Sequence, residues 1–399
     1  MRLLRQYIHM GRIKTKPMRM ADAHTEGYGY LVIEDGVIAE VVWMNPPEDP
    51  GHHLLMPAFT DLHVHFRDPG LTHKEDLETG MRAALAGGFT DVQLMGNTQP
   101  ITSTMEQVED VIARARALDL IDVHPCISIT RDFDGKDLSH LNEVKAPVVM
   151  LTDDGFGVAD AKTLFDAMNL AKEKGMRLTL HEEEPAFSKT DMRLAEDVMT
   201  LRDLHLGRVT GCYTHFAHVS TKQAIDWIRA AKAGSDRFTC EVTPHHLVLW
   251  DNPYRVNPPI RAKEDVDALR EALTDGTVDA IATDHAPHTK EDKDKGAPGM
   301  TGLELAFALC YTHLIKGGII GIKTLLRLLA QRPAELMGLQ QGLLQPGMDA
   351  DLAIADLAAE YTVDPEAFYS KGKNTPFSGA RLQGRIVETW HKGVRKFPF

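Results

Sequence analysis

Cysteine is scarce in this chain, which has four among its 399 residues and no Cys-x-x-Cys pair. This spacing disfavours a disulfide framework and a cysteine-based metal motif. We interpret the four as small buried apolar side chains of a protein in a reducing compartment. They are Cys126, Cys212, Cys240 and Cys310.

Basic runs and long apolar runs are also missing. The formal net charge of −13 disfavours a nucleic-acid-binding surface, but it permits an anionic substrate, because that requires only a local arginine. No stretch is apolar for long enough to span a membrane, and Met1 to Gln6 do not resemble the start of a secretory signal. We therefore expect a cytoplasmic protein with neither a nucleic-acid nor a membrane partner.

The middle of the chain alternates between short apolar runs and amphipathic stretches. The apolar runs have the length and composition of β-strands. They cover residues 58–65, 90–95, 123–129, 148–151, 177–181, 212–218, 238–243 and 280–284. Helical periodicity occurs between them, as in 105–117, 159–174, 221–231 and 266–274. This α/β alternation predicts a (β/α)8 TIM barrel. A doubly wound sheet is the weaker alternative, because no Gly-x-Gly-x-x-Gly follows an early strand.

Both ends of the chain are richer in β-strand signals. An Asp-Gly turn at Asp35-Gly36 separates two apolar runs and predicts a hairpin. Similar runs return at 350–356 and 384–390. We predict that residues 1–56 and 340–399 form a composite β-sandwich domain and that residues 57–339 form the barrel. We interpret the charged loop 288–299 as a candidate mobile cover over a site.

The strongest chemical signal is the stretch Asp61-Leu62-His63-Val64-His65. Residues two apart on a strand face the same side, so His63 and His65 direct their imidazoles into one space. A solvated strand edge would also explain this pair alone. The stretch 282–288, Ala-Thr-Asp-His-Ala-Pro-His, strengthens the interpretation as a metal site.

Barrel active sites lie at the C-terminal ends of the strands. Side chains that can bind metal follow several predicted strands there. They are His63, His65, Asp153, Asp154, His181, His218 and Asp284. This set suits one or two Zn²⁺ ions per subunit, and such ions lower the pKa of bound water enough to give hydroxide near neutral pH.

Two divalent ions close together need an anionic bridge. The end of the fourth predicted strand offers Asp153 and Asp154 but no lysine that could be carboxylated, so an aspartate is the predicted bridge. Spacing alone does not choose between the two, and Asp153 could equally cap the segment that follows. Asp284 is the predicted proton shuttle, because a carboxylate beside the metal can pass a proton to a leaving group.

Four further residues are candidates for binding the substrate. Arg67 faces the same way as the histidine pair and is interpreted as a clamp for a carboxylate; the alternative is a salt bridge to a nearby acid. His288 lies on the loop after Asp284, where it can touch substrate. Asn97 and Asn257 are amide contacts or turn residues. We interpret the adjacent His245 and His246 as structural.

The stretch His63-Val64-His65-Phe66-Arg67-Asp68-Pro69-Gly70 resembles the metal motif of dihydroorotases, in the amidohydrolase superfamily. The resemblance extends over nearly the whole chain. It includes residues 96–100, 152–155, 218–222, 241–247, 257–259, 282–288, 347–352 and 374–377. The best match is the long bacterial type, whose fourth strand carries Asp rather than carboxylated Lys.

The resemblance implies reversible cyclisation of N-carbamoyl-L-aspartate to L-dihydroorotate in pyrimidine (UMP) biosynthesis. It implies that His63 and His65 bind one metal ion, that His181 and His218 bind the other, and that Asp154 bridges them. Asp284 would complete the first site and shuttle the proton. The substrate carboxylate would lie against Arg67, Asn97 and His288, and Asn257 would contact the ring. We also expect a homo-oligomer, and an association with aspartate transcarbamoylase stays open.

The chain departs from the family pattern at three places. Gly96 stands where proline is usual, Glu182-Glu183-Glu184 follows His181 in a shortened segment, and Pro298-Gly299 replaces a longer loop on the substrate side. Two alternatives compete. A hydantoinase- or allantoinase-like enzyme would use the same metals but have less need of Arg67. A non-catalytic homologue that scaffolds aspartate transcarbamoylase is disfavoured, because every matching ligand is present.

Overall fold

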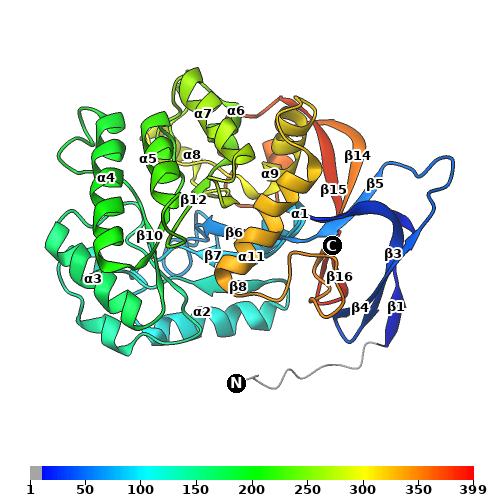
Figure 1. Ribbon diagram of the computed structural model, residues 1–399, viewed down its shortest axis with the longest axis horizontal. Coiled ribbons are helices and arrows are strands. Elements are labelled where there is room, and N and C mark those ends of the chain that lie inside the picture. The colour runs from blue at the N-terminus through cyan, green and yellow to red at the C-terminus, as the bar shows by residue number, and fades with distance from the viewer. Residues whose placement is uncertain (1–10) are drawn as a thin grey trace.

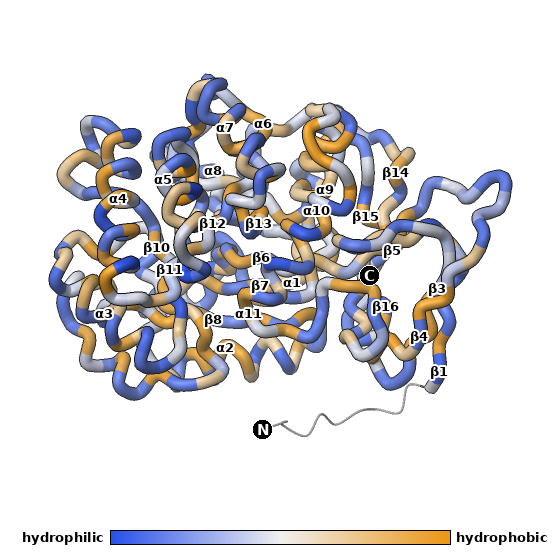
Figure 2. Tube along the Cα trace, viewed as in Figure 1, coloured by the Kyte–Doolittle hydropathy of each residue, from blue (hydrophilic) through white to orange (hydrophobic). Residues whose placement is uncertain are grey.

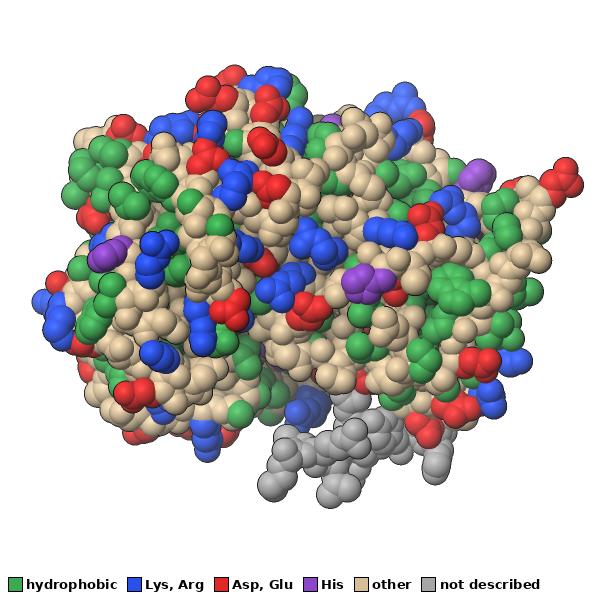
Figure 3. All heavy atoms as spheres, in the orientation of Figure 1, with side chains coloured by type: hydrophobic (Ala, Val, Ile, Leu, Met, Phe, Trp, Pro, Cys, Tyr) green, Lys and Arg blue, Asp and Glu red, His purple; other side chains and the backbone are tan. Residues whose placement is uncertain are grey.

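The computed structural model describes residues 11–399, so the expectation for Met1 to Gln6 lies outside the described residues. Within them, no helix combines the length and apolar character needed to cross a membrane. The four cysteines are buried free thiols, as expected. Acidic and basic side chains are interspersed on the face shown in Figure 3.

Short parallel strands from the middle of the chain form a barrel (Figure 1). A three-stranded part contains β6 (Phe59–Val64), β7 (Phe89–Leu94) and β8 (Asp122–Pro125). A five-stranded part contains β9 (Met150–Leu151), β10 (Arg177–Leu180), β11 (Tyr213–Phe216), β12 (Phe238–Val242) and β13 (Ala280–Ile281). Parallel bridges between Ile127 and Leu151 and between Val64 and His285 join the two parts into a ring. The predicted TIM barrel is confirmed.

Helices surround these strands, and side-chain caps explain where five of them begin. Asp76, Thr104, Asp160, Asp191 and Thr221 each accept a hydrogen bond from a first-turn N–H. The helices are α1 (Leu77–Gly87), α2 (Met105–Leu118), α3 (Ala161–Glu173), α4 (Met192–Thr210) and α5 (Lys222–Lys232). Each buries one apolar face, as helical periodicity requires. Figure 2 shows the resulting contrast between apolar central strands and mixed outer helices.

The remaining helical segments, apart from α7 (Lys263–Thr274), are single or double turns. They are α6 (Pro244–Val248), α7, α8 (Lys290–Asp294), α9 (Ala306–Cys310), α10 (Ile322–Leu326) and α11 (Arg332–Met337). Single 3₁₀ or π turns occur at η1 (Arg131–Phe133), η2 (Ser139–Glu143), η3 (Leu303–Leu305), η4 (Tyr311–Ile315), η5 (Arg327–Gln331) and η6 (Pro365–Ala367). The helix α8 lies inside the charged loop 288–299.

The two ends of the chain meet in one eight-stranded sheet, at the right of Figure 1. It contains β1 (Arg12–Lys14), β2 (Met18–Ala21), β3 (Glu26–Glu34), β4 (Val37–Met44), β5 (His53–Pro57), β14 (Leu352–Thr362), β15 (Arg381–His391) and β16 (Val394–Phe397). Asp35 and Gly36 both have positive φ, 49° and 78°, at the turn between β3 and β4.

The strand β5 pairs with β2 on one side and β14 on the other, which joins the N-terminal and C-terminal strands directly. These strands are therefore hydrogen-bonded into a single sheet, and the composite β-sandwich stays a prediction. The domain limits 1–56, 57–339 and 340–399 stay predictions, and residues 1–10 of the first lie outside the described range.

Candidate active site

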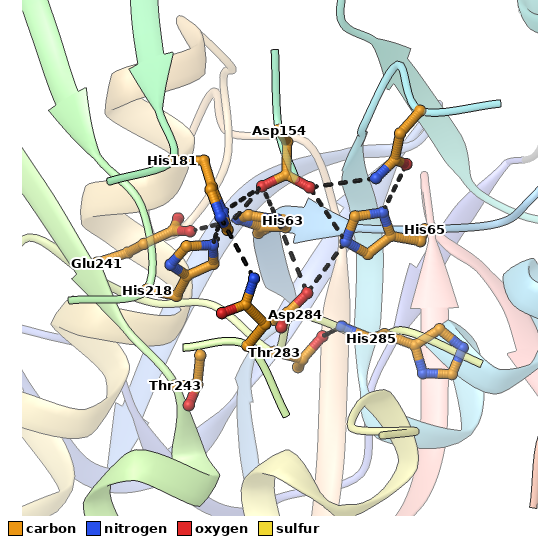
Figure 4. Close-up of polar contacts among 12 residues, drawn as sticks. His63, His65, Asp154, His181, His218, Glu241, Thr243, Thr283, Asp284 and His285 are labelled. Atoms are coloured by element: carbon orange, nitrogen blue, oxygen red, sulfur yellow. Dashed lines mark hydrogen bonds and ion pairs between the residues drawn. The ribbon is translucent and has the colours of Figure 1, made fainter. Parts of the chain in front are cut away.

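The predicted metal ligands meet beyond the C-terminal ends of the barrel strands (Figure 4). His63 lies in β6 and His65 directly after it, while the others follow β9, β10, β11 and β13. All are at most 5% exposed. They are His63, His65, Asp154, His181, His218 and Asp284. Parallel strands end at one edge of a barrel, and this shared edge explains why residues far apart in sequence converge.

One group of ligand atoms involves the histidine pair. His63 Nε2 lies 3.3 Å from Asp154 Oδ1, and His65 Nε2 lies 3.6 Å from Asp154 Oδ2. Asp284 Oδ1 lies 3.0 Å from His65 Nε2 and 3.7 Å from His63 Nε2. Two imidazole nitrogens therefore face two carboxylates across one small space.

A second group involves His181 and His218, which face the same Asp154 oxygen as His63. His181 Nδ1 lies 3.5 Å and His218 Nε2 lies 3.6 Å from Asp154 Oδ1, and the two nitrogens are 3.0 Å apart. In each group, the ligand atoms of the histidines and Asp154 lie within 4.8 Å of one another. Asp154 belongs to both groups, which is the position of a bridging ligand.

These distances fit divalent metal ions. Zn–N bonds of 2.0–2.1 Å at a tetrahedral ion put neighbouring ligand atoms about 3.3 Å apart, close to the separations found here. His63 Nε2 and Asp154 Oδ1 are buried and lack a hydrogen-bond partner among residues 11–399. Buried polar atoms are normally satisfied, so two such atoms facing each other indicate a bound cation.

The outer nitrogens of three histidines are held by acceptors. His63 Nδ1 donates to Glu241 Oε1 at 2.8 Å, and His65 Nδ1 donates to the Asn97 amide oxygen at 2.8 Å. His181 Nε2 donates to Glu183 Oε2 at 2.9 Å. Each bond fixes the proton on the outer nitrogen and leaves the inner lone pair for a metal ion.

Charge supports the same arrangement. Burial opposes ionisation of Asp154, but the nearby His63, followed by the close approach of His181 and His218, holds its pKa well below the usual value. Burial also raises the pKa of Glu241, yet hydrogen bonds from His215 and His63 outweigh it and bring the pKa to about 2. Both carboxylates are therefore ionised at neutral pH.

The two adjacent aspartates differ in their surroundings. Asp153 accepts hydrogen bonds from the backbone N–H of Ile129 at 2.7 Å and from the Thr130 hydroxyl at 2.5 Å. These bonds tie the end of β9 to the preceding loop and turn the Asp153 carboxylate away from the histidines. Asp154 faces the histidines instead.

Arg67 and His288 lie against each other. Arg67 Nη2 is 3.4 Å from His288 Nε2, and Arg67 Nε donates to the Pro287 carbonyl at 3.4 Å. No carboxylate within residues 11–399 forms an ion pair with Arg67. The candidate acids are engaged elsewhere: Asp68 pairs with Arg114 at 2.8 Å, and Glu75 lies near His285. Burial and the Arg67 charge lower the pKa of His288 to about 3, so this imidazole is neutral.

The two candidate asparagines contact groups that orient the ligands. Besides its bond to His65, Asn97 donates to Asp154 Oδ2 at 3.3 Å. Asn257 donates to Glu183 Oε2 at 2.7 Å. The structure therefore brings Asn97 and Asn257 to the edge of the metal groups, while Arg67 and His288 form a separate basic corner.

Sequence reasoning missed Glu183 and Glu241 as orienting carboxylates. The available signal for Glu241 was an acidic residue inside the buried strand β12. Its second partner is His215, at 3.0 Å. His246 is held by Thr243 and by the Pro258 carbonyl, in line with a structural role.

A third buried group, Asp91, Asp351 and His391, also has ligand atoms close together. Its members have hydrogen-bond partners within the protein. Asp91 is bonded to His124 and Gln341, both at 2.8 Å, and His391 Nδ1 lies 3.1 Å from Asp351 Oδ1. This group joins the barrel to the terminal sheet and is explained as a structural network.

A sequence model of the amidohydrolase family matches residues 54–396. Among solved structures, L-hydantoinase (dihydropyrimidinase) from Arthrobacter aurescens has a TM-score of 0.87 at 24% identity, over 96% of this chain and 95% of that chain. Dihydropyrimidinase from Brevibacillus agri has a TM-score of 0.83 at 21% identity over the same shares. These likenesses show the fold alone. By the family match, the chain belongs to the amidohydrolase family.

Curated relatives narrow the assignment. A dihydroorotase of Clostridium botulinum is 47% identical over 391 residues, which cover 96% of this chain and 98% of that protein. A dihydroorotase of Bacillus caldolyticus is 42% identical over 91% of this chain and 95% of that protein. Within the amidohydrolases the chain therefore belongs with the dihydroorotases, and the family resemblance seen in the sequence is confirmed.

Proposed function

We propose that this protein is a zinc-dependent dihydroorotase that interconverts N-carbamoyl-L-aspartate and L-dihydroorotate in pyrimidine biosynthesis. The observation that supports this most directly is Arg67, a half-buried guanidinium beside His288 that has no ion pair among the described residues. L-Dihydroorotate is a cyclic amide with a ring carboxylate, which supplies the missing anion.

We assign one ion to His63, His65 and Asp284 and a second to His181 and His218, with Asp154 shared. The sharing of Asp154 by both groups supports two ions per subunit, and the mixture of imidazole and carboxylate donors supports Zn²⁺. When bound, such ions polarise the scissile carbonyl and activate water. Metal analysis of the purified protein tests both the identity and the number of ions.

Asp284 is proposed to move the proton. In hydrolysis its carboxylate accepts a proton from the attacking water and donates it to the ring nitrogen as the C–N bond breaks. In cyclisation the same carboxylate takes the proton from the carbamoyl nitrogen. Its place 3.0 Å from His65 Nε2 keeps it at the reacting centre.

Arg67 and His288 are proposed to orient the substrate. Arg67 and neutral His288 hold the ring carboxylate together with Asn97, and Asn257 contacts the ring. Since Asn97 also bonds His65 and Asp154, it links recognition of the carboxylate to alignment of the ligands.

The fold neighbours make a hydantoinase-like activity the main competitor. Hydantoin and allantoin lack a ring carboxylate, so binding them would leave the Arg67 charge without a partner. Hydrolysis of L-dihydroorotate, hydantoin and allantoin by the zinc-loaded protein separates the two functions. A scaffold without catalysis would be inactive on all three.

We further propose a homo-oligomer in the cytoplasm. An exposed apolar stripe at helical spacing on α4, visible as green side chains at the upper left of Figure 3, supports self-association. Its members are Leu194, Val198, Leu201 and Val209, which are 39%, 38%, 50% and 61% exposed. Light scattering during gel filtration tests the oligomer, cell fractionation tests the compartment, and co-purification tests an association with aspartate transcarbamoylase.

A further inference from the structure

Hydrogen bonds and an ion pair hold the loop that carries His288. Thr289 caps α8, accepting from the Asp292 N–H at 3.1 Å, and the Asp292 carboxylate accepts from the Thr289 N–H at 3.2 Å. Asp292 also forms an ion pair with Lys74 at 3.4 Å. These contacts hold α8 in the structure, and the role of 288–299 as a mobile cover stays a prediction.

Lys293, in the same loop, has an unusual set of partners. Its ammonium group donates to three backbone carbonyls: Arg255 at 2.9 Å, Ala297 at 2.8 Å and Gly299 at 2.8 Å. It also lies 4.5 Å from the centroid of the Tyr254 ring. A lysine ammonium has three N–H donors, so all three are used, and the ring adds a cation–π contact.

These partners belong to two different walls of the proposed substrate pocket. Ala297 and Gly299 lie in the loop that carries His288, while Tyr254 and Arg255 immediately precede the segment that carries Asn257. Gly299 N–H donates to the Arg255 carbonyl at 3.1 Å and adds a second link between the walls. Lys293 therefore connects the loop that carries His288, which is proposed to bind the substrate carboxylate, with the segment that carries Asn257, which is proposed to contact the ring.

The close fit of the loop requires glycine at position 299. Its φ is +124°, and a Cβ atom there would lie 2.8 Å from the Cβ of Ala286. On the inner side, the Asn374 side chain accepts from the His288 N–H at 2.9 Å and donates to the Gly299 carbonyl at 3.1 Å. Hydrogen bonds to Asn374 thus hold the backbone of His288, and hydrogen bonds from Lys293 hold the rest of the loop.

We propose that Lys293 is a positioning residue that sets the distance between His288 and Asn257 and so determines affinity for the substrate. This rests on the proposed dihydroorotase function. Lys293 touches neither the metal ligands nor Arg67, so its loss moves a binding wall and leaves the reacting groups in place. Misplacement of such a wall by about 1 Å lowers productive binding by tenfold or more.

Steady-state kinetics with L-dihydroorotate test this in the zinc-loaded protein. Lys293→Met should raise KM about tenfold and change kcat less than twofold, by the positioning argument above. Lys290→Met is the matched control. Lys290 is exposed on the same helix, and within residues 11–399 its ammonium group bonds Asp294 alone, at 2.6 Å, so both constants should stay within twofold. Lys293→Arg retains the charge and part of the hydrogen bonding, and its KM should lie between those of wild type and Lys293→Met.

Binding of orotate, an unreactive ring carboxylate, measured by calorimetry provides a readout independent of turnover. Its Kd should rise by the same factor in Lys293→Met and stay unchanged in Lys290→Met. Wild-type KM and orotate affinity in Lys293→Met would overturn the positioning role, as would a lowered melting temperature with unchanged KM. A wild-type protein inactive on L-dihydroorotate would instead overturn the proposed function on which this role rests.

Discussion

Glu241 provides the sharpest test of how the metal groups are oriented. Its two carboxylate oxygens accept from His63 Nδ1 at 2.8 Å and His215 Nε2 at 3.0 Å. Glu241→Gln keeps the size of the side chain but offers only one acceptor oxygen, because the other end of the amide is a donor. One of the two imidazoles must then give up its outer proton or lose its partner.

The consequence is largest if His63 changes. Its proton would move to Nε2, the nitrogen that lies 3.3 Å from Asp154 Oδ1, and the lone pair needed by a metal ion would be lost. Removal of such an orienting partner lowers metal affinity by about 10–100-fold, which corresponds to about 1.4–2.7 kcal/mol. We expect a loss in this range for Glu241→Gln.

A competition titration with a chromogenic zinc chelator measures this affinity. Glu304→Gln is a suitable control, because Glu304 is a carboxylate away from the metal groups that accepts from the backbone N–H of Tyr369 and Ser370. The control should alter stability and leave zinc affinity unchanged. Wild-type zinc affinity in Glu241→Gln would refute the argument that the His63 tautomer is set by this carboxylate.

Three further predictions follow from the site. Asp284→Ala should abolish turnover while most of the metal stays bound, because the histidines and Asp154 remain; near-normal turnover would contradict the proton-shuttle role. Arg67→Met should weaken substrate binding by roughly 2–4 kcal/mol, the loss of a charged pair, and an unchanged KM would make Arg67 structural. The Glu241 pKa of about 2 lies below its ordinary 4.5, so its stabilisation is present above pH 4.5 and is lost as pH falls toward 2. The metal-free protein should thereby lose about 3 kcal/mol of stability, and acid-unfolding curves of wild type and Glu241→Gln that coincide would contradict this.

Much of the barrel could be predicted from the sequence because burial and periodicity are local properties. The predicted strand 177–181 corresponds to β10 (Arg177–Leu180), and the predicted helix 105–117 corresponds to α2 (Met105–Leu118). Once the barrel is known, residues that follow its strands must share one edge. His181 and His218 could therefore be grouped although 37 residues separate them.

Contacts between distant polar residues could not be predicted in this way. Glu241 is 178 residues from His63, and no periodicity shows that a buried acid in an apolar strand has two imidazole partners. The difference between Asp153 and Asp154 depends on the backbone amides of residues 129 and 130, which only the folded chain brings near. The pairing of Lys293 with three carbonyls has no sequence signal, since its surroundings show only a charged loop.

The most direct test of the central claim is hydrolysis of L-dihydroorotate by the zinc-loaded protein, with hydantoin and allantoin measured alongside. We predict clear preference for L-dihydroorotate, because its ring carboxylate supplies the anion that Arg67 lacks. Activity on hydantoin or allantoin alone would contradict the proposed substrate, and metal-bound protein inactive on all three would contradict catalysis.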